Sequence, residues 1–93
     1  MLYAIIGQDV ENSTEKRLAV RPAHLQRIEA LNESGRLVLA GPFPADDGSF
    51  MGSLIVADFD SLDEARLWAE ADPYMHHGVF SQVEVKPFRK VLP

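Results

Sequence analysis

Three short segments of this chain are apolar at almost every position, and they limit what the chain can fold into. They are Leu2–Gln8, Arg36–Gly41 and Met51–Phe59. Short apolar runs bounded by turn residues are typical of β-strands. A strand with one face in water should alternate apolar and polar side chains, and these three do not. The sequence therefore predicts a sheet whose two faces are both apolar and must both be covered.

The residues after the first segment predict a helix. Asn12 or Ser13 could cap its start, because both side chains accept hydrogen bonds from free backbone N–H groups. Apolar residues then recur at helical spacing from Pro22 to Ser34, and Gly35 stops the run. Pro22 leaves two alternatives, a bend within one long helix or the first turn of a second helix.

A second helix is expected after Ser61, which could cap it together with Glu64 in a capping box. Asp72-Pro73 ends or breaks this helix. Residues 42–49 are rich in Pro, Gly and Asp and predict a loop, whereas Val79–Lys86 alternates apolar and polar residues and predicts a last strand. The inner face of the second helix is formed by Leu62, Ala65, Trp68 and Ala69.

The predicted order is β-α-β-β-α-β, which indicates an α+β fold of the ferredoxin-like type. Right-handed crossovers place both helices on one face of a four-stranded antiparallel sheet. A length of 93 residues is that of one domain, so residues 1–93 are expected to form a single domain. Two helices can cover only one face, and monomers rarely expose a large apolar patch. We therefore expect a homodimer formed through the open sheet face.

The charge and composition exclude several classes of function. The net charge is −5, and the nine Lys and Arg residues are scattered, so binding to nucleic acid is disfavoured. The absence of cysteine excludes disulfides and Cys-ligated zinc. The N-terminal segment lacks the features of a signal peptide, and no apolar run is long enough for a membrane helix. We expect a cytoplasmic protein.

His24 is the first candidate catalytic residue. It precedes Ile28 by four residues and Leu31 by seven, which places it at the edge of the core-facing stripe of the helix. A polar group buried there needs a partner. The alternative is a structural histidine whose ring is bonded to a backbone carbonyl.

Asp72 is the second candidate. It continues the helical spacing of Ala65 and Ala69, so a carboxylate stands where an apolar residue is due. Its alternative role is turn formation before a proline. Because both helices lie on the same sheet face, His24 and Asp72 could meet there. A carboxylate that orients an imidazole gives a general base or acid at neutral pH.

Further residues are expected to bind substrate near this pair. Arg21 could attract an anionic substrate, although the base rate for arginine favours a solvated surface residue, and Tyr74 could line a pocket or pack in the core. Gly41-Pro42 and Gly52-Ser53 flank the predicted loop, and their glycines would let the backbone approach a ligand, although the needs of an ordinary turn explain them equally well. No metal-ligand spacing or Gly-rich phosphate loop is present, so no metal or bound cofactor is expected.

Several motifs resemble those of the YCII-related (YciI-like) domain family. The motifs are Arg21-Pro22-Ala23-His24-Leu25, Gly35-Arg36-Leu37, Gly41-Pro42, Gly52-Ser53, Asp72-Pro73-Tyr74 before Gly78-Val79, and Val85-Lys86-Pro87-Phe88. The resemblance implies a dimeric α+β barrel, and it implies a His–Asp pair in a pocket, at His24 and Asp72. Some family members act on chlorinated or hydroxylated aromatic compounds.

Two functions follow from these observations. The first is a cofactor-independent enzyme of lyase or isomerase type that uses the His–Asp pair for proton transfer on a small organic substrate, aromatic or phenolic in kind. The second is a non-catalytic dimeric module that binds a small molecule or has an accessory role.

Overall fold

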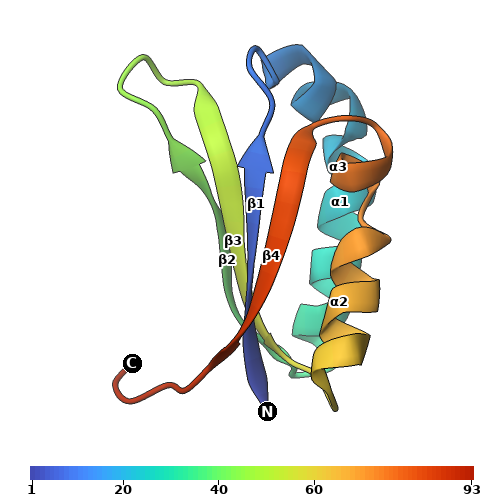
Figure 1. The fold of residues 1–93 in the computed structure, drawn as a ribbon, viewed down its shortest axis with the longest axis vertical. Coiled ribbons are helices and arrows are strands. Elements are labelled where there is room, and N and C mark those ends of the chain that lie inside the picture. Colours follow the sequence, from blue (N-terminus) through green and yellow to red (C-terminus); the bar gives the residue numbers. More distant parts are fainter.

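The computed structural model describes residues 1–93 and has two layers, a four-stranded sheet and a layer of helices (Figure 1). The ferredoxin-like βαββαβ order predicted from the sequence is confirmed, with one short helix, α3, that was not predicted. In chain order the elements are β1 (Leu2–Asp9), α1 (Thr14–Glu33), β2 (Leu37–Pro44), β3 (Phe50–Asp58), α2 (Leu62–Glu70), α3 (Pro73–His76) and β4 (Phe80–Phe88).

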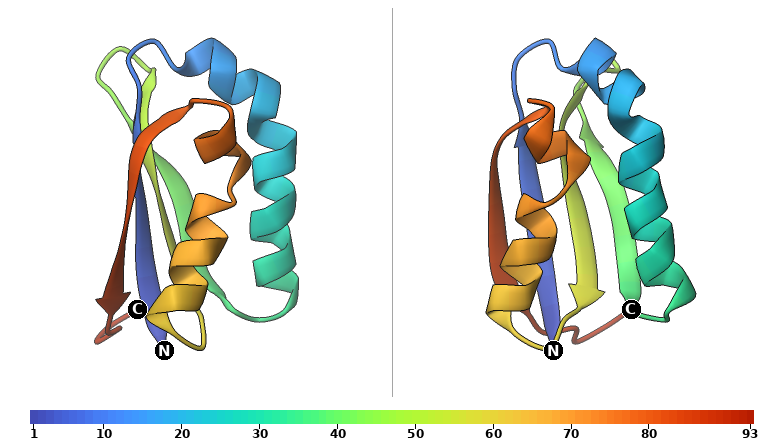
Figure 2. Two further views of the ribbon diagram at one scale, coloured as in Figure 1. Left: turned by 45° about the vertical axis from the view of Figure 1, so that its right-hand side comes forward. Right: turned by 90° about the vertical axis from the view of Figure 1, so that its right-hand side faces the viewer.

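The strand order in the sheet is β2-β3-β1-β4, and all neighbouring strands are antiparallel. Both long helices lie side by side on the same face of this sheet (Figure 2). α2 packs on β1 and β4, whereas α1 lies toward the β2 edge. The two helices therefore cover different halves of the sheet.

α1 is one continuous helix through Pro22, so the proline does not open a second helix. Ser13 stands at the N-cap position, but its side chain makes no capping bond and instead donates to the Oδ2 atom of Asp9 at 2.6 Å. Ser13 is therefore the N-cap residue, as one of the two alternatives predicted, but the side-chain capping bond is absent and the hydroxyl hydrogen-bonds to the end of β1 instead. Gly35 follows the helix with φ of +76°, a conformation that favours glycine.

The predicted loop at residues 42–49 begins too early, because β2 continues through Pro42 to Pro44. Proline cannot donate to a sheet, but β2 is an edge strand, where one side of the backbone needs no partner. Ser61 caps α2 as predicted: its Oγ accepts from the N–H of Glu64 at 3.1 Å. The Glu64 carboxylate accepts in turn from the N–H of Asp60.

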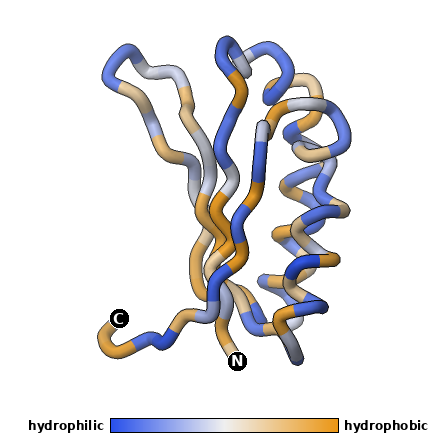
Figure 3. The backbone as a smooth tube through the Cα atoms, viewed as in Figure 1, coloured by the Kyte–Doolittle hydropathy of each residue, from blue (hydrophilic) through white to orange (hydrophobic).

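The core lies between the sheet and the helices. Apolar residues gather in the central and lower parts of the strands, whereas the β2–β3 loop is hydrophilic (Figure 3). Ala65 and Ala69 of α2 have exposed fractions of 0% and 1%, so this helix lies close against the sheet. The strand residues in the same cluster are Tyr3, Ile5, Ile55 and Ala57.

The other face of the sheet carries no helix (Figure 1). Ile6 of β1 pairs with Leu54 of β3, and both side chains point to this face, because their neighbours Ile5 and Ile55 point to the core. Leu39 and Phe43 of β2 are 47% and 39% exposed. The chain by itself therefore leaves an apolar sheet face uncovered, as the two-sided pattern predicted. No helix is both long enough and apolar enough to span a membrane.

Candidate functional site

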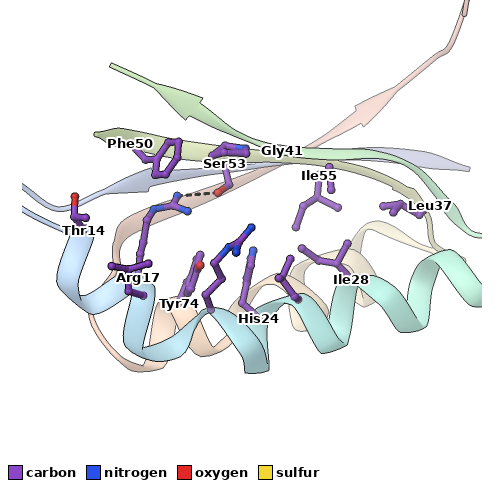
Figure 4. Close-up of a pocket in the computed structure, with 15 residues that line it drawn as sticks. Thr14, Arg17, His24, Ile28, Leu37, Gly41, Phe50, Ser53, Ile55 and Tyr74 are labelled. Carbon is purple, nitrogen blue, oxygen red and sulfur yellow. Dashed lines mark hydrogen bonds between the residues drawn. The ribbon is translucent and has the colours of Figure 1, made fainter. Parts of the chain in front are cut away.

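A pocket of about 560 Å³ opens between α1 and the strands β2 and β3 (Figure 4). This volume is within the range of small-molecule sites. The α1 side of the pocket carries Arg17, Arg21 and His24, whereas the buried residues of α2 are alanines. Tyr74 of α3 closes it on one side.

All the predicted substrate-binding residues lie at this pocket. Arg21 comes from α1, Gly41 and Pro42 from β2, Ser53 from β3 and Tyr74 from α3. His24 also lines the pocket, whereas Asp72 lies behind it. Their roles in binding and catalysis stay predictions.

His24 and Asp72 are in direct contact. The Nδ1 atom of His24 lies 2.9 Å from Oδ1 and 3.0 Å from Oδ2 of Asp72. Both side chains are more than nine-tenths buried. An ionised carboxylate can only accept a hydrogen bond, so the proton between the two groups lies on Nδ1. In the neutral ring, Nε2 then carries the free lone pair.

The Nε2 atom of His24 makes no hydrogen bond within the protein, yet it is not enclosed. The one enclosed side-chain nitrogen or oxygen without a hydrogen-bond partner is Nη1 of Arg27. Since His24 lines the pocket, Nε2 is accessible from there. The ring nitrogen that can accept a proton therefore faces the space where a ligand would bind.

Asp72 is held in place by the start of α3. Its Oδ1 atom accepts from the backbone N–H of Tyr74 at 2.8 Å, and Pro73 occupies the first helical position, where proline is favoured. The interpretation of Asp72 as turn chemistry is therefore also correct, since one carboxylate caps a helix and contacts His24. On the far side, Nη1 of Arg27 lies 3.8 Å from Oδ2. Burial lowers the pKa of the Arg27 guanidinium, and the charge of Asp72 opposes this change.

Tyr74 forms a rigid wall beside the imidazole. Its ring stacks on that of His24 with centroids 3.8 Å apart and planes 6° from parallel. Burial raises the pKa of the Tyr74 hydroxyl above its usual value, and the charges of Arg17 and Arg21 oppose this. Stacking fixes the ring plane of His24, and the Asp72 bond fixes its rotation within that plane.

Arg17 is the site residue that the sequence analysis missed. Its Nε and Nη2 atoms donate to the two carboxylate oxygens of Asp9 at 2.6 and 2.9 Å. Nη2 also donates to the carbonyl of Gly52 and to Oγ of Ser53. One signal was available: Arg17, Arg21 and His24 follow one another at four and three residues, which puts them on one face of a helix.

His76 and His77 lie at the end of α3 and do not line the pocket. No group of three or more His, Asp or Glu side chains is arranged to hold a metal ion.

The fold is that of ferredoxin-like proteins of the dimeric α+β barrel class, and a pocket lies against one helix. Within this class the chain belongs to the YCII family, because the model of the YCII-related domain matches residues 1–89.

Two curated relatives match over nearly the whole chain. Protein YciI of Escherichia coli O6:H1 is 53% identical and covers 99% of this chain and 100% of its own length. An uncharacterised protein of Haemophilus influenzae is 47% identical, with the same coverage of both chains.

A solved structure also matches closely. It is the 5-chloro-2-hydroxyhydroquinone dehydrochlorinase TftG from Burkholderia phenoliruptrix AC1100, in complex with 2,5-dihydroxybenzoquinone. The TM-score is 0.84 at 28% sequence identity, and the match covers 96% of this chain and 94% of the neighbour. This neighbour is an enzyme that acts on an aromatic substrate.

Proposed function

We propose that this protein is an enzyme of lyase or isomerase type that transfers a proton on a small aromatic or phenolic molecule. His24 is the general base, and Asp72 orients its ring. The reaction begins when Nε2 takes a proton from the bound molecule. The carboxylate of Asp72 then stabilises the imidazolium, which can return the proton to the product or to solvent.

The observation that carries this proposal is the His24–Asp72 contact at the pocket wall. Two carboxylate oxygens within 3.0 Å of Nδ1 leave only Nε2 as a proton acceptor. The stacked Tyr74 ring keeps Nε2 directed at the pocket, so little reorganisation is needed when the substrate binds. A histidine that only stabilised the fold would not need its second nitrogen open to the pocket.

The solved neighbour supports the reaction type. Dehydrochlorination removes a proton and a chloride from one molecule, and the proton requires a base. The neighbour's ligand is a hydroxylated quinone ring, which is of a size that a pocket of about 560 Å³ can hold. The same class of substrate is therefore the first to test on this chain.

The test is turnover of hydroxylated and chlorinated aromatics, beginning with 5-chloro-2-hydroxyhydroquinone and chloride release. General acid–base groups contribute about 10²–10⁴-fold to rate, so we expect His24→Ala to lose at least 100-fold in turnover. His76→Ala, a histidine outside the pocket, is the matched control and should retain full activity. If His24→Ala retains near-full activity, His24 is not the general base and the proposed mechanism is wrong. If the wild type converts none of these compounds, the alternative of a non-catalytic binding module takes its place.

We also propose that two copies pair through the open sheet face. The exposed Leu39 and Phe43 support this pairing, because apolar patches of this kind mark interfaces. Sedimentation at micromolar concentration should give twice the 10.4 kDa of one chain. Leu39→Glu with Phe43→Glu should give a monomer, whereas Leu67→Glu, on the exposed side of α2, should leave the dimer unchanged. A wild-type monomer would contradict the proposal.

A further inference from the structure

The pocket differs in charge from the rest of the molecule. The chain has fourteen Asp and Glu residues against nine Lys and Arg, yet no acidic residue lines the pocket. Arg17, Arg21 and His24 do line it. The pocket therefore has two guanidinium groups and no carboxylate in its lining, although the protein as a whole is acidic. This arrangement gives the pocket a local electrostatic potential that favours anions.

The side chain of Arg17 is held in one position by burial and by hydrogen bonds. Its side chain is only 8% exposed, and Asp9 holds it through two hydrogen bonds while Ser53 accepts a third. The guanidinium carbon also lies 4.9 Å from the ring centre of Tyr74 and 5.4 Å from that of Phe50. Figure 4 shows the side chain crossing from α1 toward Ser53 at one end of the pocket. A side chain fixed in this way loses little entropy when it binds a ligand.

The remaining nitrogen of Arg17 is free for a ligand. Its hydrogen bonds to Asp9, Gly52 and Ser53 use Nε and Nη2, and Nη1 is not among the enclosed, unpartnered atoms. The Tyr74 hydroxyl also hydrogen-bonds to the Arg17 side chain, so at least one N–H group of Nη1 is left for a ligand. Planar guanidinium donors match the oxygens of organic anions well.

Arg21 supplies the net charge. Arg17 is balanced by Asp9, but Arg21, one turn further along α1, makes no ion pair. It is exposed at the pocket, where it can attract an anion from solvent. Behind a neutral His24, the charge of Asp72 is opposed by that of Arg27 at 3.8 Å. The pocket therefore carries one uncompensated positive charge, which suits a monoanion.

The rest of the pocket is apolar. Leu25 and Ile28 of α1 face Leu37 and Ile55 of the sheet, and Figure 4 shows Ile28, Leu37 and Ile55 at the end of the pocket opposite Arg17. His24 lies between the two ends. A ligand with a charged head and an apolar body would therefore place its middle beside Nε2.

We propose that the pocket binds a small organic monoanion whose oxygen head contacts Arg17 and Arg21 and whose apolar ring or chain extends toward Ile28. This inference deepens the proposed function, on which it rests for the pocket being the substrate site. The head can be a carboxylate or a ring-bound phenolate, since both present anionic oxygen in the plane of the group.

The first experiment compares matched probes by titration calorimetry at constant ionic strength and neutral pH. Benzoate, phenylacetate and cinnamate are each compared with the corresponding amide, and 4-nitrophenolate with 4-nitroanisole. A hydrogen bond to a charged group is worth enough to make each anion bind about ten- to hundredfold more tightly than its neutral partner. Acetate, which has the head without the body, should bind at least tenfold more weakly than benzoate. Equal binding of acids and amides would overturn the inference.

The second experiment assigns the head contacts. Arg21→Gln should reduce the preference for the acid at least fivefold, and because Arg21 is exposed, this variant should fold. Asp9→Asn with Arg17→Met removes the buried pair together, without leaving a buried charge, and should abolish the preference. Arg66→Gln, which removes one exposed charge on α2, is the control and should change nothing. If Arg66→Gln reduced the preference for the acid as much as Arg21→Gln does, the preference would depend only on the net charge of the protein, and the inference would be wrong.

His24→Ala separates this inference from the proposed function. The variant should keep the acid-over-amide preference while losing turnover. If the preference disappears in His24→Ala but persists in Arg21→Gln and in the double variant, the imidazole recognises the anion and the inference is wrong. If the preference follows the two arginines but His24→Ala keeps its activity, the anion site stands and the proposed function fails.

Discussion

The two long helices lie on the same sheet face but meet it in different ways. α2 presents Ala65 and Ala69, which are almost completely buried and pack in one core cluster with Ile28 and Leu31 from the C-terminal part of α1. α1 presents Arg17, Arg21 and His24 over the other half, and a pocket opens there. The helical layer therefore forms packed core on the α2 side and a pocket lined by polar side chains on the α1 side.

The difference lies in how the buried polar groups are satisfied. Arg17 and His24 each contact a buried carboxylate. Arg17 donates to Asp9 at the end of β1, and His24 contacts Asp72 at the start of α3. These partners hold the side chains away from collapse into the space beneath α1. Polar side chains that have hydrogen-bond partners within the protein can therefore line a cavity. The alanines of α2 have no polar group to satisfy and pack directly against the sheet.

The largest effect should come from breaking the Arg17–Asp9 pair. Arg17→Met leaves the Asp9 carboxylate, which is 1% exposed, without its counter-charge. Removing one member of a buried pair costs about 3–5 kcal/mol, and urea unfolding should show a loss of that size in the free energy of unfolding. Asp9→Asn with Arg17→Met should restore most of it. A loss below about 1 kcal/mol in the single variant would mean that the pocket wall does not depend on the pair.

A matched enlargement of one alanine on each side tests the packing difference. Ala65→Leu adds three carbons where no space exists and should cost about 1–3 kcal/mol of unfolding free energy. Ala40→Leu, on β2, points into the pocket and should change stability by less than about 0.5 kcal/mol. It should instead weaken ligand binding by filling the cavity. Equal stability losses would show that the two halves are packed alike.

The smallest effect concerns Tyr74 and appears only at alkaline pH. Burial raises the pKa of its hydroxyl above the ordinary value of 10.0, so the folded protein holds this proton more tightly than the unfolded chain does. The resulting stability is fully present below about pH 10 and is lost as the pH rises through the folded-state pKa. Urea unfolding of wild type and Tyr74→Phe should therefore differ by a constant amount near neutral pH. Above pH 10 the wild type should lose stability relative to the variant, and parallel curves throughout would contradict this.

Much of the fold could be predicted from periodicity. Apolar runs on both faces of three strands, helical spacing before Gly35 and the cap at Ser61 each depend on residues close in sequence. His24 and Asp72 could be singled out for the same reason, because each is polar at a position where the local helical pattern calls for burial.

The missed features depend on contacts between distant residues. Arg17 became a site residue through its bonds to Gly52 and Ser53, which are 35 and 36 residues away, and no local pattern encodes those bonds. The extension of β2 through two prolines depends on its place at the sheet edge, which only the strand order reveals. α3 was not predicted, because Asp72-Pro73 was interpreted as a helix stop and the same two residues also start a helix.

The central claim is that His24 and Asp72 act as one catalytic unit at the pocket. A double-mutant cycle of His24→Ala and Asp72→Asn tests it, with turnover of the best substrate as the readout. Asparagine keeps an oxygen for the N–H of Tyr74, so α3 should remain capped. If the pair is one unit, His24→Ala should lose about 100-fold or more, Asp72→Asn less, and the double variant no more than His24→Ala. Losses that multiply, or near-full activity in His24→Ala, would contradict the claim.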